Sequence, residues 1–207
     1  MASSTARLRA FRPADTDALV DVCVRTADAG SDATGLLPDD RLWADIYLLP
    51  YLERHPDLAF VVELDDASDA AGYIVATDDT AAFAEWFSRE WWPSLGRPRA
   101  SEVPDDAAHA LERQLLGRGE QGPDAWAPDG APAHLHIDLL PVTQGRGAGR
   151  ALMDLLCAEL AARGIAGVHA TAGTANAGAL AFYPRVGFDA LPPDGGGQTF
   201  VRRLAQG

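Results

Sequence analysis

The spacing of apolar residues along the chain changes repeatedly between the two-residue period of a strand and the 3.6-residue period of a helix. Proline and glycine clusters mark the boundaries, and Pro50 is expected to end the second helix. The pattern predicts strands over residues 7–11, 58–64, 72–77, 134–140, 167–172 and 198–204, and helices over residues 14–28, 39–49, 147–163 and 176–186. The second and third strands should form a hairpin, because only a short acidic stretch joins them.

The stretch 79–133 departs from this pattern. It holds four of the five tryptophans and predicts two helices, near residues 80–89 and 105–116. A structureless loop of this length would be unusual, so we interpret it as a helical insertion within a single domain spanning residues 1–207. Trp86, Trp91 and Trp92 are expected to form a local apolar core there.

The charge balance narrows the possible partners. The chain carries 30 acidic and 17 basic side chains for a net charge of −13, which disfavours binding to nucleic acid and to anionic membrane surfaces. All 17 basic residues are arginine. The absence of lysine excludes a P-loop cation and a Schiff-base amine.

Two further features bear on location. The sequence shows no signal-peptide pattern and no apolar run of about 18 residues, so we expect a cytoplasmic protein with no membrane partner. Cys23 and Cys157 each lie in an apolar helical pattern, which is typical of reduced, buried thiols.

A glycine-rich turn between the predicted strand 134–140 and helix 147–163 carries the strongest functional signal. Free N–H groups and the positive end of the helix dipole at such a turn bind phosphate oxygens. Arg150 stands where a dinucleotide-binding turn needs glycine or alanine, and a P-loop would need lysine. The remaining pattern is Q-x-x-G-x-G, formed within Gln144, Gly145, Arg146, Gly147, Ala148, Gly149 and Arg150.

This motif resembles the pyrophosphate-binding signature of the GNAT family of N-acetyltransferases. A second segment is similar to that family's other cofactor motif and consists of Asn176, Ala179, Phe182 and Tyr183, followed by Gly187 and Phe188. The resemblance implies an α/β (α+β) GNAT fold, a central mixed twisted sheet flanked by helices, with acetyl-CoA as cofactor. The helical insertion would then lie between the third and fourth strands.

Within the family, the chain most resembles the acetyltransferase-like C-terminal domain of O-GlcNAc hydrolases and its stand-alone bacterial relatives. The shared short segments are Gly72-Tyr73, Thr77-Asp78, Trp92-Pro93 and Ile137-Asp138-Leu139. Activity is doubtful in part of that group, so a non-catalytic acyl-CoA-binding or interaction module stays open as an alternative function.

The family resemblance also implies roles for individual residues. The fourth and fifth strands should separate, so that the pantetheine arm pairs with the main chain of Ile137, Leu139 and Leu140. The Leu139 N–H would then polarise the thioester carbonyl. Tyr183 would protonate the departing thiolate, against the alternative of a tyrosine that only packs in the core.

Acetylation of an amine also needs a proton acceptor. His134, His136 and Asp138 alternate along one predicted strand and should share one face. We predict that Asp138 orients or deprotonates the amine; alternatively, its carboxylate only satisfies a nearby backbone group. Three ligands on one strand rarely complete a tetrahedral metal site, so no metal is expected. His55, His109 and His169 have no partners at ligand spacing and are expected at the surface or in caps.

The predicted activity is transfer of acetyl from acetyl-CoA to a primary amine, on a protein lysine or N-terminus or on a small molecule, without a covalent enzyme intermediate. Asp28, Asp32 and His136 are candidates for binding the acceptor, since acidic side chains would attract a cationic amine. The two aspartates could instead belong to a solvated loop. An aminoglycoside-like acceptor is a further possibility. The pattern selects neither the acceptor nor the oligomeric state.

Overall fold

The computed structural model describes residues 6–64, 70–143, 145–193 and 197–205. Within them, one mixed sheet has the strand order β1-β2-β3-β4-β5-β7-β6. Neighbouring strands are antiparallel except β4 and β5, which run parallel. The strands are β1 (Ala6–Ala10), β2 (Phe60–Leu64), β3 (Ala70–Thr77), β4 (Ala133–Leu139), β5 (Gly167–Gly173), β6 (Asp189–Ala190) and β7 (Gly197–Arg203).

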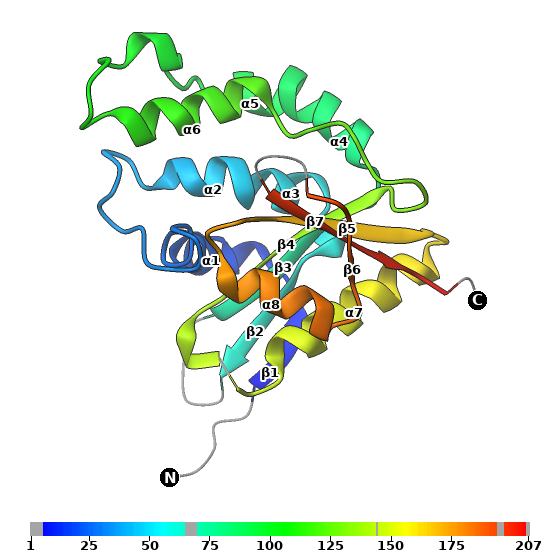
Figure 1. Ribbon diagram of the computed structural model, residues 1–207. Coiled ribbons are helices and arrows are strands. Elements are labelled where there is room, and N and C mark those ends of the chain that lie inside the picture. Colours follow the sequence, from blue (N-terminus) through cyan, green and yellow to red (C-terminus); the bar gives the residue numbers. More distant parts are fainter. Residues whose placement is uncertain (1–5, 65–69, 144, 194–196, 206–207) are drawn as a thin grey trace.

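Helices cover both faces of this sheet (Figure 1). Helix α7 (Ala148–Ala162) buries Leu152, Met153 and Leu156 against one face. The other face packs against α1 (Thr16–Val24), α2 (Arg41–Tyr47) and α3 (Leu49–Arg54). Helix α8 (Ala177–Arg185) lies on the same side as α7. The predicted mixed sheet flanked by helices is therefore confirmed.

The stretch between β3 and β4 forms a third layer, which lies over α2 and α3 (Figure 1). It contains α4 (Thr80–Trp86), a π-helical turn (Phe87–Trp91), α5 (Trp92–Ser94) and α6 (Ala110–Gln121). Its tryptophans pack locally as expected: the rings of Trp86 and Trp91 lie 5.9 Å apart, and Trp92 stacks on Phe87 at 6.2 Å.

The predicted ends of three helices need correction, and one strand was missed. The helix expected over residues 14–28 ends at Val24, and the helix expected near residues 105–116 is α6 (Ala110–Gln121). Pro50 does not end a helix, because the break falls at Leu48 and Pro50 occupies the first turn of α3, where its missing N–H costs nothing. The two-residue strand β6 was not predicted, since it is too short to show a period. The acidic turn predicted between β2 and β3 lies outside the described residues. Among the described residues, no helix is both long and apolar enough to cross a membrane.

Candidate active site

The parallel strands β4 and β5 pair only at Ala133–Val168 and His134–His169. Beyond these pairs the two strands separate, although β4 continues to Leu139 and β5 to Gly173. The part of β4 that follows His134 therefore has a free edge on the β5 side. The family resemblance implied a separation of the fourth and fifth strands, and this opening lies there.

The main chain of β4 presents polar groups to the opening. The Leu140 N–H donates to the Ala71 carbonyl on the β3 side. In an antiparallel ladder the backbone groups of alternate residues point the same way, so Asp138 also pairs toward β3. The N–H and C=O groups of Ile137 and Leu139 consequently point toward the opening. An extended ligand can hydrogen-bond to this free edge as an added strand would.

Asp138 lies on the face of β4 that packs toward α1, and its neighbour across the β3–β4 ladder is the fully buried Tyr73. The Tyr73 hydroxyl donates a 2.5 Å hydrogen bond to Asp138 Oδ2. Burial raises the pKa of the Asp138 carboxyl, and the Tyr73 and Thr26 hydroxyl groups partly oppose that rise. Tyr73 was not singled out from the sequence as a partner of Asp138, since only the strand register brings the two together.

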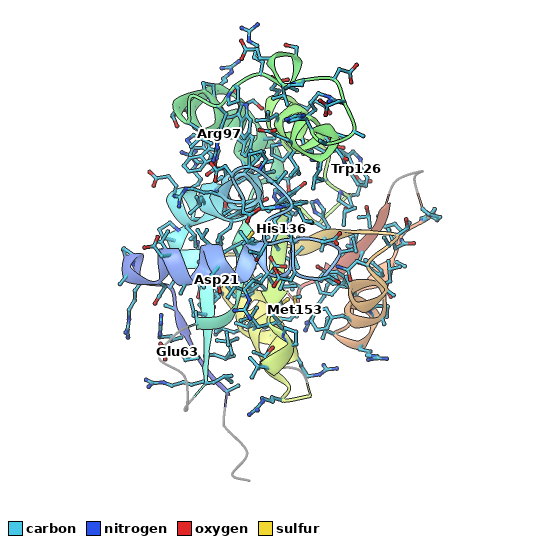
Figure 2. The ribbon with its side chains drawn as sticks, turned by 90° about the vertical axis from the view of Figure 1, so that its left-hand side faces the viewer. Asp21, Glu63, Arg97, Trp126, His136 and Met153 are labelled. Carbon is cyan, nitrogen blue, oxygen red and sulfur yellow. The ribbon has the colours of Figure 1, made fainter. Side chains whose placement is uncertain are left out.

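His134 and His136 lie on that same face, as the alternation predicted. His134 is buried, and its two ring nitrogens contact the hydroxyl groups of Tyr51 at 2.7 Å and Thr80 at 2.8 Å. His136 is partly exposed, and its Nε2 lies 3.1 Å from the same Tyr51 hydroxyl. Figure 2 places His136 near the middle of the molecule. Tyr51 and Thr80 could not be predicted as partners of these histidines, because they come from α3 and α4 and meet β4 only in the folded chain.

The glycine-rich turn that opens α7 has the shape of an anion site. Gly145 and Gly147 adopt φ angles of +72° and +74°, which favour glycine, and no heavy atom lies within 4 Å of a Cβ placed on either residue. The Ala151 N–H donates to the Gly147 carbonyl, which is the first helical hydrogen bond of α7 within the part of the chain that the structure describes. The N–H groups of Ala148 and Gly149 precede it and can donate to a ligand. Gln144 lies outside the described residues.

Gly149 fixes the position of this helix start. A Cβ there would lie 3.0 Å from both Leu139 Cδ1 and Phe182 Cε2, so any larger residue would have to push these two side chains apart. Arg150 donates to the Arg185 carbonyl at the end of α8, which ties the two helices together, and Arg146 Nε donates to the Val142 carbonyl. The predicted contacts of these two arginines with phosphate stay predictions.

The second motif forms the start and the buried face of α8. The Asn176 side chain caps α8 by accepting a 2.9 Å hydrogen bond from the Ala179 N–H. Tyr183 is buried, and its ring stacks on Phe200 with centroids 5.0 Å apart. Burial, and secondarily the charge of Asp138, raise the pKa of Tyr183. A high pKa keeps this hydroxyl protonated, as a proton donor requires.

The loop after α1 reaches the start of α8. A Cβ placed on Gly30 would lie 3.7 Å from the Asn176 amide, so this loop passes close to the second motif. Asp28 and Asp32 are exposed in the loop. The Thr34 hydroxyl, and secondarily the Thr34 N–H that donates to Asp32, hold the pKa of Asp32 below its usual range. Both carboxylates thus belong to an exposed loop near the motif, and their contact with an acceptor stays a prediction.

The remaining histidines, His55, His109 and His169, differ in how deeply they are buried. His169 is buried, with its Nδ1 2.9 Å from the Ala131 carbonyl, and His55 is partly buried against Thr77. His55 occupies the cap position at the end of α3, as expected, whereas the expectation for His169 was wrong, because the return loop from the insertion covers it. His109 caps α6 at the surface, as predicted. Among the described residues, no three histidine, cysteine or carboxylate side chains are grouped so that they could hold a metal ion.

Comparison with known proteins agrees with this geometry. Residues 28–188 match the acetyltransferase (GNAT) family. The crystal structure of SsHAT is 38% identical, covers 97% of this chain and 99% of its own, and superposes with a TM-score of 0.85.

More distant structures share the fold. The phosphinothricin acetyltransferase of Sinorhizobium meliloti, solved in complex with acetyl-CoA, is 18% identical, with 98% of this chain and 90% of its own covered and a TM-score of 0.56. YncA of Salmonella typhimurium, described as a putative acetyltransferase with its cofactor acetyl-CoA, is 15% identical, with 98% and 95% covered and a TM-score of 0.52.

The separated strands, the glycine-rich helix start and the capped second motif define an acyltransferase site for a diphosphate cofactor. The chain belongs to the GNAT family of acetyltransferases. Its cofactor is acetyl-CoA, and the residues present fit that group: open space over Gly145 and Gly147 suits the pyrophosphate, and the free edge of β4 suits an extended arm.

Proposed function

We propose that this acetyltransferase moves the acetyl group of acetyl-CoA directly to a primary amine, with both substrates bound at once. The observation that carries the proposal is the free β4 edge, where the Leu139 N–H lies one residue from the carboxylate of Asp138. Acetyl-CoA supplies an activated acyl group as a thioester. The direct route is supported by the two cysteines, Cys23 and Cys157, which are buried and have raised thiol pKa values, so neither suits a covalent intermediate.

The chain's own residues then take separate roles. The Leu139 N–H polarises the thioester carbonyl, and the Asp138 carboxylate receives and orients the ammonium group of the acceptor. Deprotonating an amine of pKa about 10.4 at pH 7 costs about 4–5 kcal/mol, so a base must accept the proton in the site, and we assign that role to Asp138. Tyr183, protonated at neutral pH, donates a proton to the leaving sulfur.

The acceptor class is tested by release of free thiol from acetyl-CoA across an amine panel. The panel holds a lysine peptide, a peptide with a free N-terminus, a polyamine and an aminoglycoside, and calorimetric titration with acetyl-CoA and with CoA runs in parallel. The proposal expects thiol release with one class of amine, and little of it with the Asp138→Asn variant. An Asp138→Asn enzyme that keeps wild-type kcat across the alkaline range would show that Asp138 does not handle the amine.

The alternative, a non-catalytic acyl-CoA-binding module, predicts binding by calorimetry with no thiol release for any amine. Variants of the glycine-rich turn test whether the heat measured by calorimetry comes from binding at the predicted pyrophosphate site. Gly147→Asp should weaken binding of both acetyl-CoA and CoA, because a carboxylate at the helix start repels the pyrophosphate and Gly147 needs a positive φ.

We also infer that, within the family, the chain belongs with the acetyltransferase-like domain of O-GlcNAc hydrolases and its bacterial relatives. Support comes from where the shared segments lie: Tyr73 donates to Asp138, so two of those segments meet at the opening. Location in the cytoplasm stays a prediction.

A further inference from the structure

A continuous chain of hydrogen bonds runs from the start of α4 to the opening between β4 and β5. The Thr80 hydroxyl lies 2.6 Å from the Pro132 carbonyl and 2.8 Å from His134 Nδ1. His134 Nε2 lies 2.7 Å from the Tyr51 hydroxyl, which in turn lies 3.1 Å from His136 Nε2. The links join α4 to β4 and β4 to α3, and His136 is the end that is partly exposed.

One end of the chain fixes the direction of every proton in it. The Pro132 carbonyl can only accept, so Thr80 donates its single hydroxyl proton there and accepts from His134 Nδ1–H. Burial lowers the pKa of His134 well below its ordinary value, so the ring is neutral and Nε2 carries no proton. His134 Nε2 therefore accepts from Tyr51, whose oxygen must accept from His136 Nε2–H.

This leaves Nδ1 as the basic nitrogen of His136. Burial, with the charge of Arg118 in addition, lowers the pKa of His136 to about 4, so the ring is neutral at physiological pH. His136 is the first residue on its face of β4 beyond the last β4–β5 pair, and it precedes Asp138 by two positions. Its ring therefore flanks the same opening as the Asp138 carboxylate.

We propose that Tyr51 holds His136 in the Nε2–H tautomer, so that His136 Nδ1 takes the proton lost by the acceptor nitrogen as the new N–C bond forms. This inference rests on the proposed function. The amine nitrogen forms its bond to the carbonyl carbon, the C–S bond breaks, and the sulfur takes a proton from Tyr183. The proton on His136 afterwards passes to solvent. The ammonium's other proton is lost earlier to Asp138, which passes it to solvent before the N–C bond forms, and Tyr183 regains a proton from solvent after the thiol leaves.

The low basicity of His136 suits this second proton. Bonding to the carbonyl carbon makes the nitrogen far more acidic than a free amine, so a weak base is sufficient at that stage. His134 cannot take the role, because both of its ring nitrogens are already engaged. The ionisable groups that face His136 are Tyr47 on α2, Tyr51 on α3, Arg118 on α6, and His134 and Asp138 on β4. Arg118 disfavours protonation of the ring before the reaction, and Asp138, once it has passed its own proton to solvent, is a carboxylate two positions along the same strand.

The tautomer is tested without any substrate, by long-range ¹H–¹⁵N NMR of the histidine rings at pH 7. We expect His136 to be protonated on Nε2 and bare on Nδ1. His134 and His169 should show the opposite pattern, since their Nδ1 atoms donate to Thr80 and to the Ala131 carbonyl. His169 is the internal control because it lies outside the chain of bonds. A protonated Nδ1 on His136 would overturn the proposal.

Kinetics test the role. His136→Gln keeps an amide N–H for Tyr51 but has no basic nitrogen, so kcat should fall by about 100-fold or more while KM for acetyl-CoA stays constant. Tyr51→Phe should lower kcat by about 10-fold, since it releases the ring without removing it. Tyr47→Phe, which removes a hydroxyl group beside the ring of His136 but outside the chain of bonds, should leave kcat unchanged.

Chemical rescue separates a base from a structural support. Imidazole added to His136→Ala should restore part of the rate in proportion to its concentration, and 1,2,4-triazole, a ring of the same size and much lower basicity, should restore less. Equal rescue by both rings, or wild-type kcat in His136→Gln, would refute the role. If the wild-type protein acetylates no amine, the proposed function fails, whereas the NMR spectrum still decides the tautomer.

Discussion

The hydrogen bond between Tyr73 and Asp138 gives the sharpest quantitative test of the site. Tyr73→Phe removes the hydroxyl group that donates to Asp138 Oδ2 and leaves the rest of the fully buried ring in place. That bond stabilises the ionised carboxylate, so its loss must raise the pKa of Asp138 beyond the rise that burial already causes. A hydrogen bond to a charged group contributes about 1.5–3 kcal/mol, which at about 1.4 kcal/mol per unit is a rise of about 1–2 pKa units.

Two measurements can detect this rise in the pKa of Asp138. The acidic limb of the pH profile of kcat/KM, followed by thiol release, should move up by about one to two pH units in Tyr73→Phe, because activity requires ionised Asp138. A ¹³C titration of the Asp138 carboxyl, assigned with Asp138→Asn, should show the same shift without turnover. Thr199→Val, a change of another buried hydroxyl far along the sheet, should leave both unchanged. A carboxyl pKa that stays constant or falls in Tyr73→Phe would refute the electrostatic reasoning.

Three more predictions concern stability and cofactor binding. Because the folded-state pKa of Asp138 lies above its unfolded value, its contribution to stability is complete below pH of about 4 and is lost as pH rises through the raised pKa; Asp138→Asn should therefore melt at a higher temperature than wild type at pH 8, with the difference fading toward pH 4. Gly149→Ala places a methyl 3.0 Å from Leu139 Cδ1, so it should destabilise the fold by about 1–3 kcal/mol in urea and weaken acetyl-CoA binding in calorimetry. Arg97→Met leaves the buried Asp45 carboxylate without its main partner and should cost about 3–5 kcal/mol in urea unfolding, with acetyl-CoA affinity unchanged. The first prediction is contradicted if Asp138→Asn and wild type melt at the same temperature at pH 8. The second is contradicted if Gly149→Ala has an unaltered Kd for acetyl-CoA, and the third if Arg97→Met loses less than about 1 kcal/mol of stability.

The sequence predicted elements best where periodicity and end signals agree. The predicted helix 147–163 matches α7 to within one residue at each end, because a long apolar stripe follows a glycine that caps it. Pro50 misled because a proline ends a helix from the interior but is tolerated in the first turn of a new one. No local pattern shows which case applies, since the break depends on how α2 and α3 pack.

The site likewise contains residues that the sequence predicted and residues that it could not predict. Strand alternation alone placed His136 and Asp138 on one face, and the spacing of glycines located the helix start. Their partners could not be predicted, because Tyr51 and Tyr73 come from a helix and a strand whose register and packing are tertiary properties. The burial of His169 depends likewise on the return loop from the insertion, whose Ala131 carbonyl it contacts.

The hydrogen bonds and ring contacts of His134 and Tyr51 also explain what α4, the first helix of the insertion, contributes to the site. Thr80 begins α4 and binds His134, while Phe83, one turn later, stacks on Tyr51 with centroids 4.4 Å apart and meets His134 edge-on at 5.4 Å. Helix α4 thus closes the side of the histidine chain that faces away from the opening and keeps water from its inner links. Without that cover, the His134 and Tyr51 side chains could exchange their hydrogen bonds for solvent, and the direction of the protons would no longer be fixed. The insertion therefore supports the site without lining the opening, because it orders the groups that hold His136.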